Sequence, residues 1–251
     1  FPMLILYILF FILPLFQTIG YSFTDYNGIN PKKEFTGLTN YFDVFQDKWF
    51  YNSMAFTGKS VLLMILLANV LGFLLALALN TKIRSRNILR AIVFCPFVFN
   101  NVTVGFIWQF LLGRFMTDLY PLTGWKVFNI GWLSDNSLVL YSVVFVKLWQ
   151  SIGYFMVIYL AGLQLLPQDP LEAAVIDGCT GIKMIRYITI PLMKPTAFVC
   201  IFLAITESLN MFPLIMSLTN GGPGHASENI SLYIYNEAFK SHRMGYASAL
   251  A

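Results

Sequence analysis

The sequence contains few charged residues for its length. Only 11% of its 251 residues are Asp, Glu, Lys or Arg, while 57% are hydrophobic and the mean hydropathy is +0.67. An ordinary soluble domain carries roughly 25% charged residues. Because so few polar side chains could not cover a globular core of this size, much of the surface must face lipid. The composition therefore excludes a disordered chain, an acidic or basic tail protein and most water-soluble folds.

The residues that metal and phosphate sites need are also scarce. The chain has two histidines and three cysteines, and the spacing of Cys95, Cys179 and Cys200 matches no metal-binding pattern. An odd number of cysteines in expected reducing surroundings argues against a disulfide. The sequence has no glycine-rich phosphate loop and no fixed-period repeat, so we expect no cofactor and no ATP site in this chain. The net charge of +4 comes from scattered residues, without the basic face of a nucleic-acid interface.

Long apolar segments are what the sequence does contain. A membrane-spanning helix needs roughly 20 apolar residues, because a rise of about 1.5 Å per residue then matches a hydrocarbon layer about 30 Å thick. A further apolar segment starts at Tyr246 and stops at Ala251, and the chain begins with Phe1, so we expect both ends to continue in a longer protein. The sequence predicts an all-α, polytopic membrane protein with six helices, the last of them truncated. The five complete spans are expected at 1–23, 54–79, 90–113, 138–166 and 195–218.

The distribution of Lys and Arg predicts the orientation of these helices. Short loops rich in basic residues stay in the cytoplasm, so we expect the turn 80–90 to be cytoplasmic. Alternation places the segment 167–194 on the same side, the loops 24–53, 114–137 and 219–245 outside, and both termini of the completed protein inside. The turn has no acidic residue, and its basic residues are Lys82, Arg84, Arg86 and Arg90.

The first apolar segment has a second interpretation, a cleaved signal peptide. Its apolar region is long, contains Pro14 and Gly20, and shows no small-residue cleavage pattern, which favours a permanent helix. We therefore divide the chain into a first helix with its outer loop, residues 1–53, and a core domain, residues 54–251.

The inner segment 167–194 is too long for a simple connection, and its sequence predicts two short helices. Asp169 is a good N-cap, and Glu172 can bond back to the cap in the capping-box manner. Gly178 can adopt the left-handed conformation that ends a helix, and Thr180 can cap a second helix.

The same segment carries small residues beside a carboxylate. Ala173, Ala174 and Gly178 would let another protein approach closely, and Glu172 offers a charged hydrogen bond. An element that docks a partner and an amphipathic helix lying on lipid headgroups are equally compatible with these residues taken alone.

A resemblance distinguishes the two. The stretch Glu172-Ala173-Ala174-Val175-Ile176-Asp177-Gly178, followed by Ile188-Thr189-Ile190-Pro191, resembles the EAA motif of permease subunits of binding-protein-dependent ABC importers. Residues 22–25, 36–41, 160–167 and 218–223 are similar to the carbohydrate-uptake branch of that family, and look most like the first of two permease partners. The sequence departs from the motif at Cys179, where Ala is usual, and at Ile185, where an aromatic residue is common; these departures concern details of the ATPase contact.

The resemblance implies a fold, an activity and a set of partners. It implies a type I importer permease that forms half of the pathway of an ATP-driven sugar importer and is not itself an enzyme. The expected partners are a second permease, two cytoplasmic ATPase subunits, an extracellular or periplasmic solute-binding protein, a sugar or oligosaccharide, and the lipid of the plasma (inner) membrane. It also implies that a coupling helix seats in a cleft of the ATPase, with Glu172, Ala173, Ala174, Asp177 and Gly178 as its coupling residues.

Polar residues within the spans are candidates for the substrate pathway. Lys147 and Glu207 lie roughly 14–16 Å from the outer ends of their helices and could pair, either as a structural ion pair or as part of a cavity. Lys59 can snorkel to the interface. Sugars are bound by amides, hydroxyls and carboxylates beside an aromatic ring, although Trp and Tyr near helix ends also serve as interfacial anchors. The tentative pathway residues are Asn101, Trp108, Gln109, Gln150, Tyr154, Glu207 and Asn210, with Asn100 as a further candidate.

The segment 220–224 is predicted to be a turn, because Asn, Gly and Pro there permit positive φ and then fix it. We expect it to shape a surface for the solute-binding protein. His225 and His242 are too isolated for a metal site and are expected to be solvated.

Two other classes of function are less compatible with the sequence. A secondary transporter would usually show inverted repeats and paired broken helices. A membrane-embedded enzyme would need a nucleophile or metal cluster. Neither pattern is evident in the sequence.

Overall fold

The computed structural model describes residues 1–30, 32–81 and 84–251, so Lys82 of the basic turn lies outside the described residues. The described part is helical, and the strand-like pairing within it is one isolated bridge between Thr24 and Phe35. Three of the described helices are long and apolar enough to cross a membrane, or up to five if each of two sharply bent helix pairs counts as one span. The all-α prediction is confirmed.

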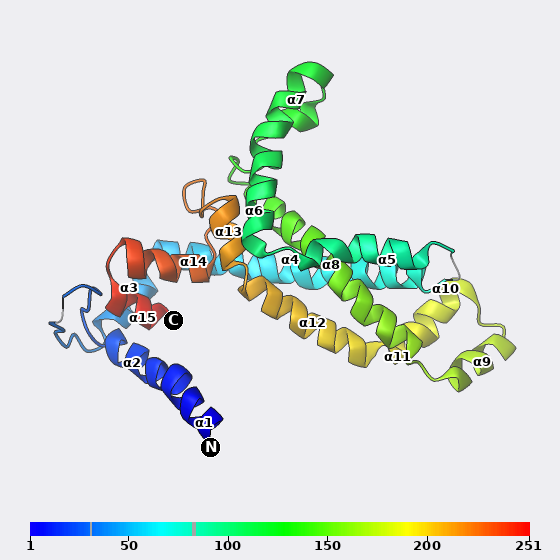
Figure 1. Ribbon diagram of the computed structural model, residues 1–251, viewed down its shortest axis with the longest axis horizontal. Coiled ribbons are helices and arrows are strands. Elements are labelled where there is room, and N and C mark those ends of the chain that lie inside the picture. The colour runs from blue at the N-terminus through cyan, green and yellow to red at the C-terminus, as the bar shows by residue number, and fades with distance from the viewer. Residues whose placement is uncertain (31, 82–83) are drawn as a thin grey trace.

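Three long helices form the centre of the molecule. α4 packs along α8, and α12 contacts both (Figure 1). Glycine allows the close approach of α4 and α8, because a Cβ on Gly72 would lie only 2.8 Å from the Cβ of Phe155. α8 is the more enclosed of this pair, with 67% of its apolar stretch buried against 22% for α4. The bounds are Lys48–Leu79 for α4, Val139–Gln164 for α8 and Lys194–Leu209 for α12.

The first predicted span stands apart from this centre. It forms a helical rod over Pro2–Ser22, and its apolar stretch is not buried against the rest of the described chain (Figure 1). The segment that follows the rod is held by α15, since the Gly245 N–H donates to the Tyr26 carbonyl at 2.7 Å and a Cβ on Gly245 would collide with the Thr24 carbonyl. The elements are α1 (Pro2–Tyr7), the π-helical turn η1 (Ile8–Ile12), α2 (Leu13–Ser22) and α15 (Met244–Leu250).

The prediction of one helix over 90–113 is wrong. The chain forms two segments there, Arg86–Val98 and Asn101–Thr123, which meet at 94°. Pro96 lacks an N–H, and the Asn100 side chain accepts a hydrogen bond from the backbone two residues on, which caps the second segment. The span is predicted by counting apolar residues, and such a count does not detect a residue that caps a helix inside an apolar run. The pieces are α5 (Arg86–Phe94), η2 (Cys95–Val98), α6 (Asn101–Gln109), the π-helical turn η3 (Phe110–Phe115) and α7 (Met116–Thr123).

The predicted span 195–218 is interrupted as well. α12 is followed by Asn210, whose ψ of 23° leaves helical geometry, and α13 (Phe212–Leu218) begins two residues later. Pro213 lies in the first turn of α13, where its missing N–H costs no hydrogen bond. α13 then packs against α6, so the helices that follow the two breaks contact each other.

At the α3 end of the molecule, Asp47 joins three helices. Its Oδ1 accepts a hydrogen bond from the Trp49 N–H at 2.8 Å and caps α4, while its Oδ2 accepts from the hydroxyls of Tyr233 on α14 and Tyr246 on α15. Burial raises the pKa of the Asp47 carboxyl, but these hydrogen bonds lower it by more, so the pKa lies below its usual 3.8. α14 lies within the loop expected over 219–245, so part of that loop is helical. The remaining elements here are α3 (Thr39–Gln46), α14 (Ile230–Tyr235) and the π-helical turn η6 (Asn236–Lys240), and η4 (Lys126–Asn129) lies before α8.

Candidate functional site

The segment 167–194 forms an elbow at one end of the molecule. Figure 1 shows α9 at the end of the long axis opposite α2 and α15. The two short helices that the sequence predicts are present, and the second runs into α12 through a 71° bend. We call this segment the coupling elbow. Its elements are α9 (Gln168–Ile176), α10 (Gly181–Met184), the π-helical turn η5 (Ile185–Thr189) and α11 (Ile190–Leu192).

Gly178 ends α9 in the left-handed conformation, with φ +74°. The Cys179 N–H donates to the Ala174 carbonyl at 2.8 Å, and the Gly178 N–H donates to the Val175 carbonyl at 3.0 Å. This pair of bonds is the Schellman arrangement, which satisfies carbonyls that a helix end leaves free. The prediction for Gly178 is confirmed, and these bonds fix the direction in which the chain leaves α9.

The start of α9 differs from the prediction. The N-cap is Pro167, so Asp169 lies in the first turn and the helix begins at Gln168. Pro167 has a fixed φ, and with it as the N-cap the helix begins two residues earlier than it would with an Asp169 cap. Its first turn has no side-chain cap bond, so the capping-box role predicted for Glu172 is wrong. Thr180 is the N-cap of α10, also without a side-chain bond. Asp169 still stabilises α9, because a negative charge near the N-terminus interacts favourably with the helix dipole.

The coupling elbow presents a mixed polar and apolar surface. Of the five predicted coupling residues, Ala174 is buried, and the other four are exposed. Large apolar side chains lie beside them, with Ile176 86% and Ile182 82% exposed. Exposed apolar side chains next to a carboxylate are typical of an interaction surface. The exposed coupling residues are Glu172, Ala173, Asp177 and Gly178.

Lys147 of α8 and Glu207 of α12 form an ion pair, with 2.6 Å between Lys147 Nζ and Glu207 Oε2. The Lys147 side chain is 3% exposed and that of Glu207 29%. Lys147 also donates to Asn101 Oδ1 at 3.4 Å. The predicted pairing is confirmed, and the pair joins α8, α12 and the first residue of α6.

Gln150 holds the chain at the break before α6. Its Nε2 donates to the Phe99 carbonyl at 2.9 Å. Because a carbonyl oxygen only accepts, this contact identifies which end of the amide is nitrogen. The other end, Gln150 Oε1, is buried and has no hydrogen-bond partner in the described part of the chain. Gln150 therefore satisfies a carbonyl that the helix break exposes and keeps a free acceptor.

These side chains line a cavity of about 330 Å³ beside the two helix breaks. The lining combines a cation, a carboxylate and three amides with two phenylalanine side chains. We call it the polar cavity. Its lining residues are Phe97, Phe99, Asn100, Asn101, Lys147, Gln150, Glu207 and Pro213.

The structure brings part of the predicted pathway set together. Tyr154 is next to the polar cavity, since its ring stacks on that of Phe97 with 4.5 Å between centroids. Asn210 lines a neighbouring cavity of about 580 Å³, which also includes Asn101. Three of the seven predicted residues line the polar cavity itself: Asn101, Gln150 and Glu207.

The other two predicted residues lie elsewhere, because α6 turns away from the cavity at its 94° bend. Trp108 packs edge-on against Phe145 and Trp149 of α8, with centroid distances of 5.3 and 5.4 Å. Gln109 is exposed. Sequence reasoning also omitted Phe97, Phe99 and Pro213 and left Lys147 out of the pathway set. The available signal was the presence of Pro96 and Pro213 inside apolar runs, which marks helix breaks.

The family described as "Binding-protein-dependent transport system inner membrane component" matches residues 68–250. The chain belongs to this family. It is therefore a transport permease and a multi-pass membrane protein, and the predicted family is confirmed.

Named relatives agree with this assignment. The permease is 36% identical over 252 residues to the probable starch degradation products transport system permease protein AmyD of Thermoanaerobacterium thermosulfurigenes, covering 100% of this chain and 85% of the relative. It is 33% identical to the multiple sugar-binding transport system permease protein MsmF of Streptococcus mutans, covering 99% and 86%. Its fold matches a crystal structure of a bacterial ABC transporter involved in the import of the acidic polysaccharide alginate. The TM-score is 0.82 at 22% identity, and the match covers 100% of this chain and 86% of the other.

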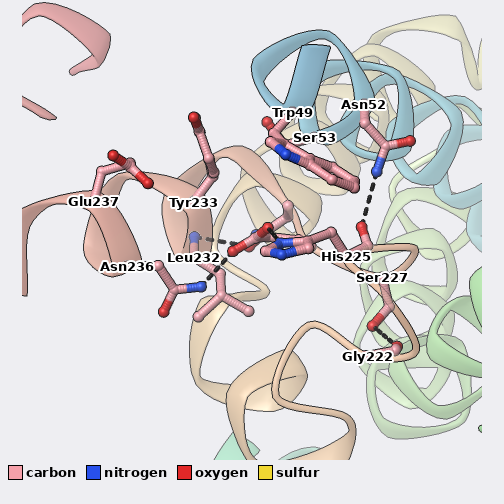
Figure 2. Close-up of polar contacts among 12 residues, drawn as sticks. Trp49, Asn52, Ser53, Gly222, His225, Ser227, Leu232, Tyr233, Asn236 and Glu237 are labelled. Atoms are coloured by element: carbon pink, nitrogen blue, oxygen red, sulfur yellow. Dashed lines mark hydrogen bonds and ion pairs between the residues drawn. The ribbon is translucent and has the colours of Figure 1, made fainter. Parts of the chain in front are cut away.

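The permease's segment 220–224 forms the predicted turn. Asn220, Gly221 and Gly224 have positive φ values of 50°, 84° and 52°. Ser227 bonds back across the turn, since its hydroxyl donates to the Gly222 carbonyl (Figure 2). These bonds give the turn a fixed shape next to α13.

His225 is exposed, as predicted, but its ring also contacts neighbouring side chains. Its Nδ1 pairs with Glu228 Oε2, and its ring lies 4.5 Å from that of Trp49 at the start of α4. Figure 2 shows Asn52 directed at the His225 carbonyl, to which it donates at 2.8 Å. Glu228 is 2% exposed and also accepts from Asn236. A buried carboxylate needs such partners, and His225 supplies one of them while its side chain stays 49% exposed. The second histidine, His242, is exposed as expected.

Proposed function

We propose that this permease forms one half of the translocation pathway of an ATP-driven sugar importer. The family and the names of the relatives, which refer to starch degradation products and to multiple sugars, support this function. The observation that carries the coupling part of the proposal is the exposed coupling elbow, in which Glu172 lies on the surface and the end of α9 is fixed by two hydrogen bonds.

The permease acts together with three kinds of partner protein. One of two cytoplasmic ATPase subunits binds the coupling elbow, and the pair hydrolyses ATP, so this chain is not the enzyme. A second permease forms the other half of the pathway, and an extracellular or periplasmic solute-binding protein delivers the sugar. The segment 219–229, fixed by His225 and Glu228, shapes the surface on which the solute-binding protein docks.

The proposed orientation places the coupling elbow and the basic turn in the cytoplasm. α4 ends at the same end of the long axis as α10, which agrees with this arrangement (Figure 1). In this proposed orientation both termini of the protein are cytoplasmic. Lys and Arg in short loops stay on the cytoplasmic side, and Arg84, Arg86 and Arg90 are in the turn.

Closure of the ATPase pair moves α9 as a rigid unit. The movement reaches α12 through α10 and α11, because these elements are continuous apart from the bend before Lys194. Glu207 is three residues before the break that ends α12 and lines the polar cavity. Rotation of α12 therefore changes the lining of the pathway and exposes it to one side of the membrane at a time.

The proposed sugar pathway includes the polar cavity and the residues beside it. Amides, a carboxylate and aromatic rings are the groups that bind sugar hydroxyls and their apolar C–H faces. We retain Asn101, Gln150, Tyr154, Glu207 and Asn210 in this pathway, while Trp108 and Gln109 stay predictions that the polar cavity does not support.

Uptake by the reconstituted complex tests the proposal. Proteoliposomes with the ATPase subunits facing the lumen and the solute-binding protein outside should accumulate a labelled sugar only when ATP is enclosed in the lumen. Glu172→Lys should assemble in the membrane but abolish uptake and weaken ATPase co-purification, while Asp118→Asn, an exposed change in the ion pair with Arg114, should leave uptake intact. Accumulation driven by an ion gradient without ATP would contradict the proposal and indicate a secondary transporter.

A further inference from the structure

The polar cavity contains one cation and one anion, and each neutralises the other. Lys147 Nζ lies 2.6 Å from Glu207 Oε2, and the Lys147 side chain is 3% exposed. The charge of Lys147 is therefore already compensated, and a second anion would have to approach the Glu207 carboxylate. A carboxylate or phosphate group on a ligand would be repelled there and would gain no free cation.

Gln150 adds a requirement for a hydrogen-bond donor. Its Nε2 is used by the Phe99 carbonyl, and its Oε1 is a buried acceptor without a partner in the described residues. Gln150 as a whole is 3% exposed and lines the cavity. A hydroxyl group both donates and accepts, whereas an ionised carboxylate only accepts. Because an unpaired buried acceptor is costly, the cavity favours a ligand that brings hydroxyl donors.

We propose that the polar cavity selects uncharged sugars, which carry hydroxyls but no carboxylate or phosphate, and that Glu207 determines this selection by neutralising Lys147. The inference rests on the proposed function, because it names the charge class of the sugar that the importer carries. Hydroxyls of such a ligand donate to Glu207 and to Gln150 Oε1 and accept from Lys147. The side chains of Phe97 and Phe99 offer apolar surface for the C–H face of the ring.

Binding of matched sugar pairs tests the selection. The complex with its partner permease and ATPase subunits, without a solute-binding protein, is placed in nanodiscs and titrated calorimetrically. The probes are maltotriose, cellotriose and mannotriose, each compared with the triuronate of corresponding linkage. We expect the wild-type complex to bind at least one neutral trisaccharide about ten-fold or more tightly than its triuronate, in line with the cost of an unpaired buried acceptor.

Two variants separate charge from folding. Glu207→Gln leaves Lys147 without its anion and should shift the neutral-to-acidic affinity ratio by about ten-fold toward the triuronates. Lys147→Gln combined with Glu207→Gln keeps the cavity uncharged and should retain the preference for neutral sugars. The control Asp118→Asn removes one acid from an exposed ion pair outside the cavity and should leave the ratio unchanged. If Glu207→Gln does not assemble, Lys147→Gln should discriminate against triuronates more strongly than the wild type.

Each other outcome would overturn the inference. The inference would be overturned if the triuronates bound the wild type as tightly as the neutral sugars. It would also be overturned if no probe bound, or if Glu207→Gln left the affinity ratio unchanged. The proposed function is tested separately, because ATP-dependent import of a triuronate that still requires Glu172 would refute the charge selection and leave the importer assignment standing.

Discussion

Lys147 on α8 and Glu207 on α12 form an ion pair in the lining of the polar cavity, with 2.6 Å between the ammonium nitrogen and a carboxylate oxygen. The pair lies beside both helix breaks, since Asn101 at the start of α6 accepts from Lys147 and Asn210 follows α12. Broken helices inside a membrane expose backbone groups that lipid cannot satisfy. The polar side chains of α8 thus hold the broken ends in place.

Removing one member of the ion pair should destabilise the permease more than removing both. Lys147→Gln leaves Glu207 unpaired, and we expect a loss of about 2–3 kcal/mol, below the 3–5 kcal/mol of a fully buried pair because Glu207 is 29% exposed. The double change to Gln at both positions should recover part of this loss. Thermal unfolding in detergent measures the difference, and strictly additive losses would show that the two side chains are not coupled.

The backbone conformation of Gly178 should matter for coupling. Gly178→Ala places a Cβ on a residue with φ +74°, at a cost of about 1–2 kcal/mol, and should weaken sugar-stimulated ATP hydrolysis and uptake. Gly178→Asn is the matched control, because Asn tolerates the left-handed region better, and it should retain most of the coupling. Equal activity of the Ala and Asn variants would mean that the end of α9 does not transmit the movement.

Asp47 should stabilise the fold in a pH-dependent manner. Hydrogen bonds from Tyr233, Tyr246 and the start of α4 lower the pKa of its carboxyl below 3.8 despite burial. A lowered folded-state pKa means that the contribution is fully present above pH 3.8 and is lost as the pH falls through the lowered value.

Asp47→Asn should therefore be less stable than the wild type at pH 7, by about 1 kcal/mol, and the difference should shrink below pH 3.8. Thermal unfolding from pH 7 to pH 3 checks this, with Asp118→Asn as a control at an exposed carboxyl. A difference that persists unchanged at pH 3 would argue against the hydrogen-bonded carboxylate as its source.

His225 should determine the rigidity of the segment 219–229. His225→Phe keeps a ring against Trp49 but removes the partner of Glu228 Oε2, so we expect faster amide hydrogen exchange in this segment and weaker docking of the solute-binding protein. His242→Phe changes the other histidine, which also has a positive φ and is exposed, and should alter neither measurement. Unchanged exchange in His225→Phe would show that the backbone of the turn suffices.

The amino-acid sequence by itself determined the membrane-spanning class, the coupling elbow and the family. Apolar length predicts a span whatever the span packs against, and the Glu172–Gly178 stretch is local, so its glycine ends a helix in any context. The apolar length of the spans did not determine where they break. Asn100 looks like a polar residue within an apolar run, and the chain is held at the break beside it because Gln150 and Lys147 of α8 donate to Phe99 and Asn101. Glu207 of α12 in turn supplies the anion that the buried charge of Lys147 requires. Only the tertiary structure brings residues 50 and more positions apart into one cavity, because that contact depends on how the helices pack and not on the local order of the chain.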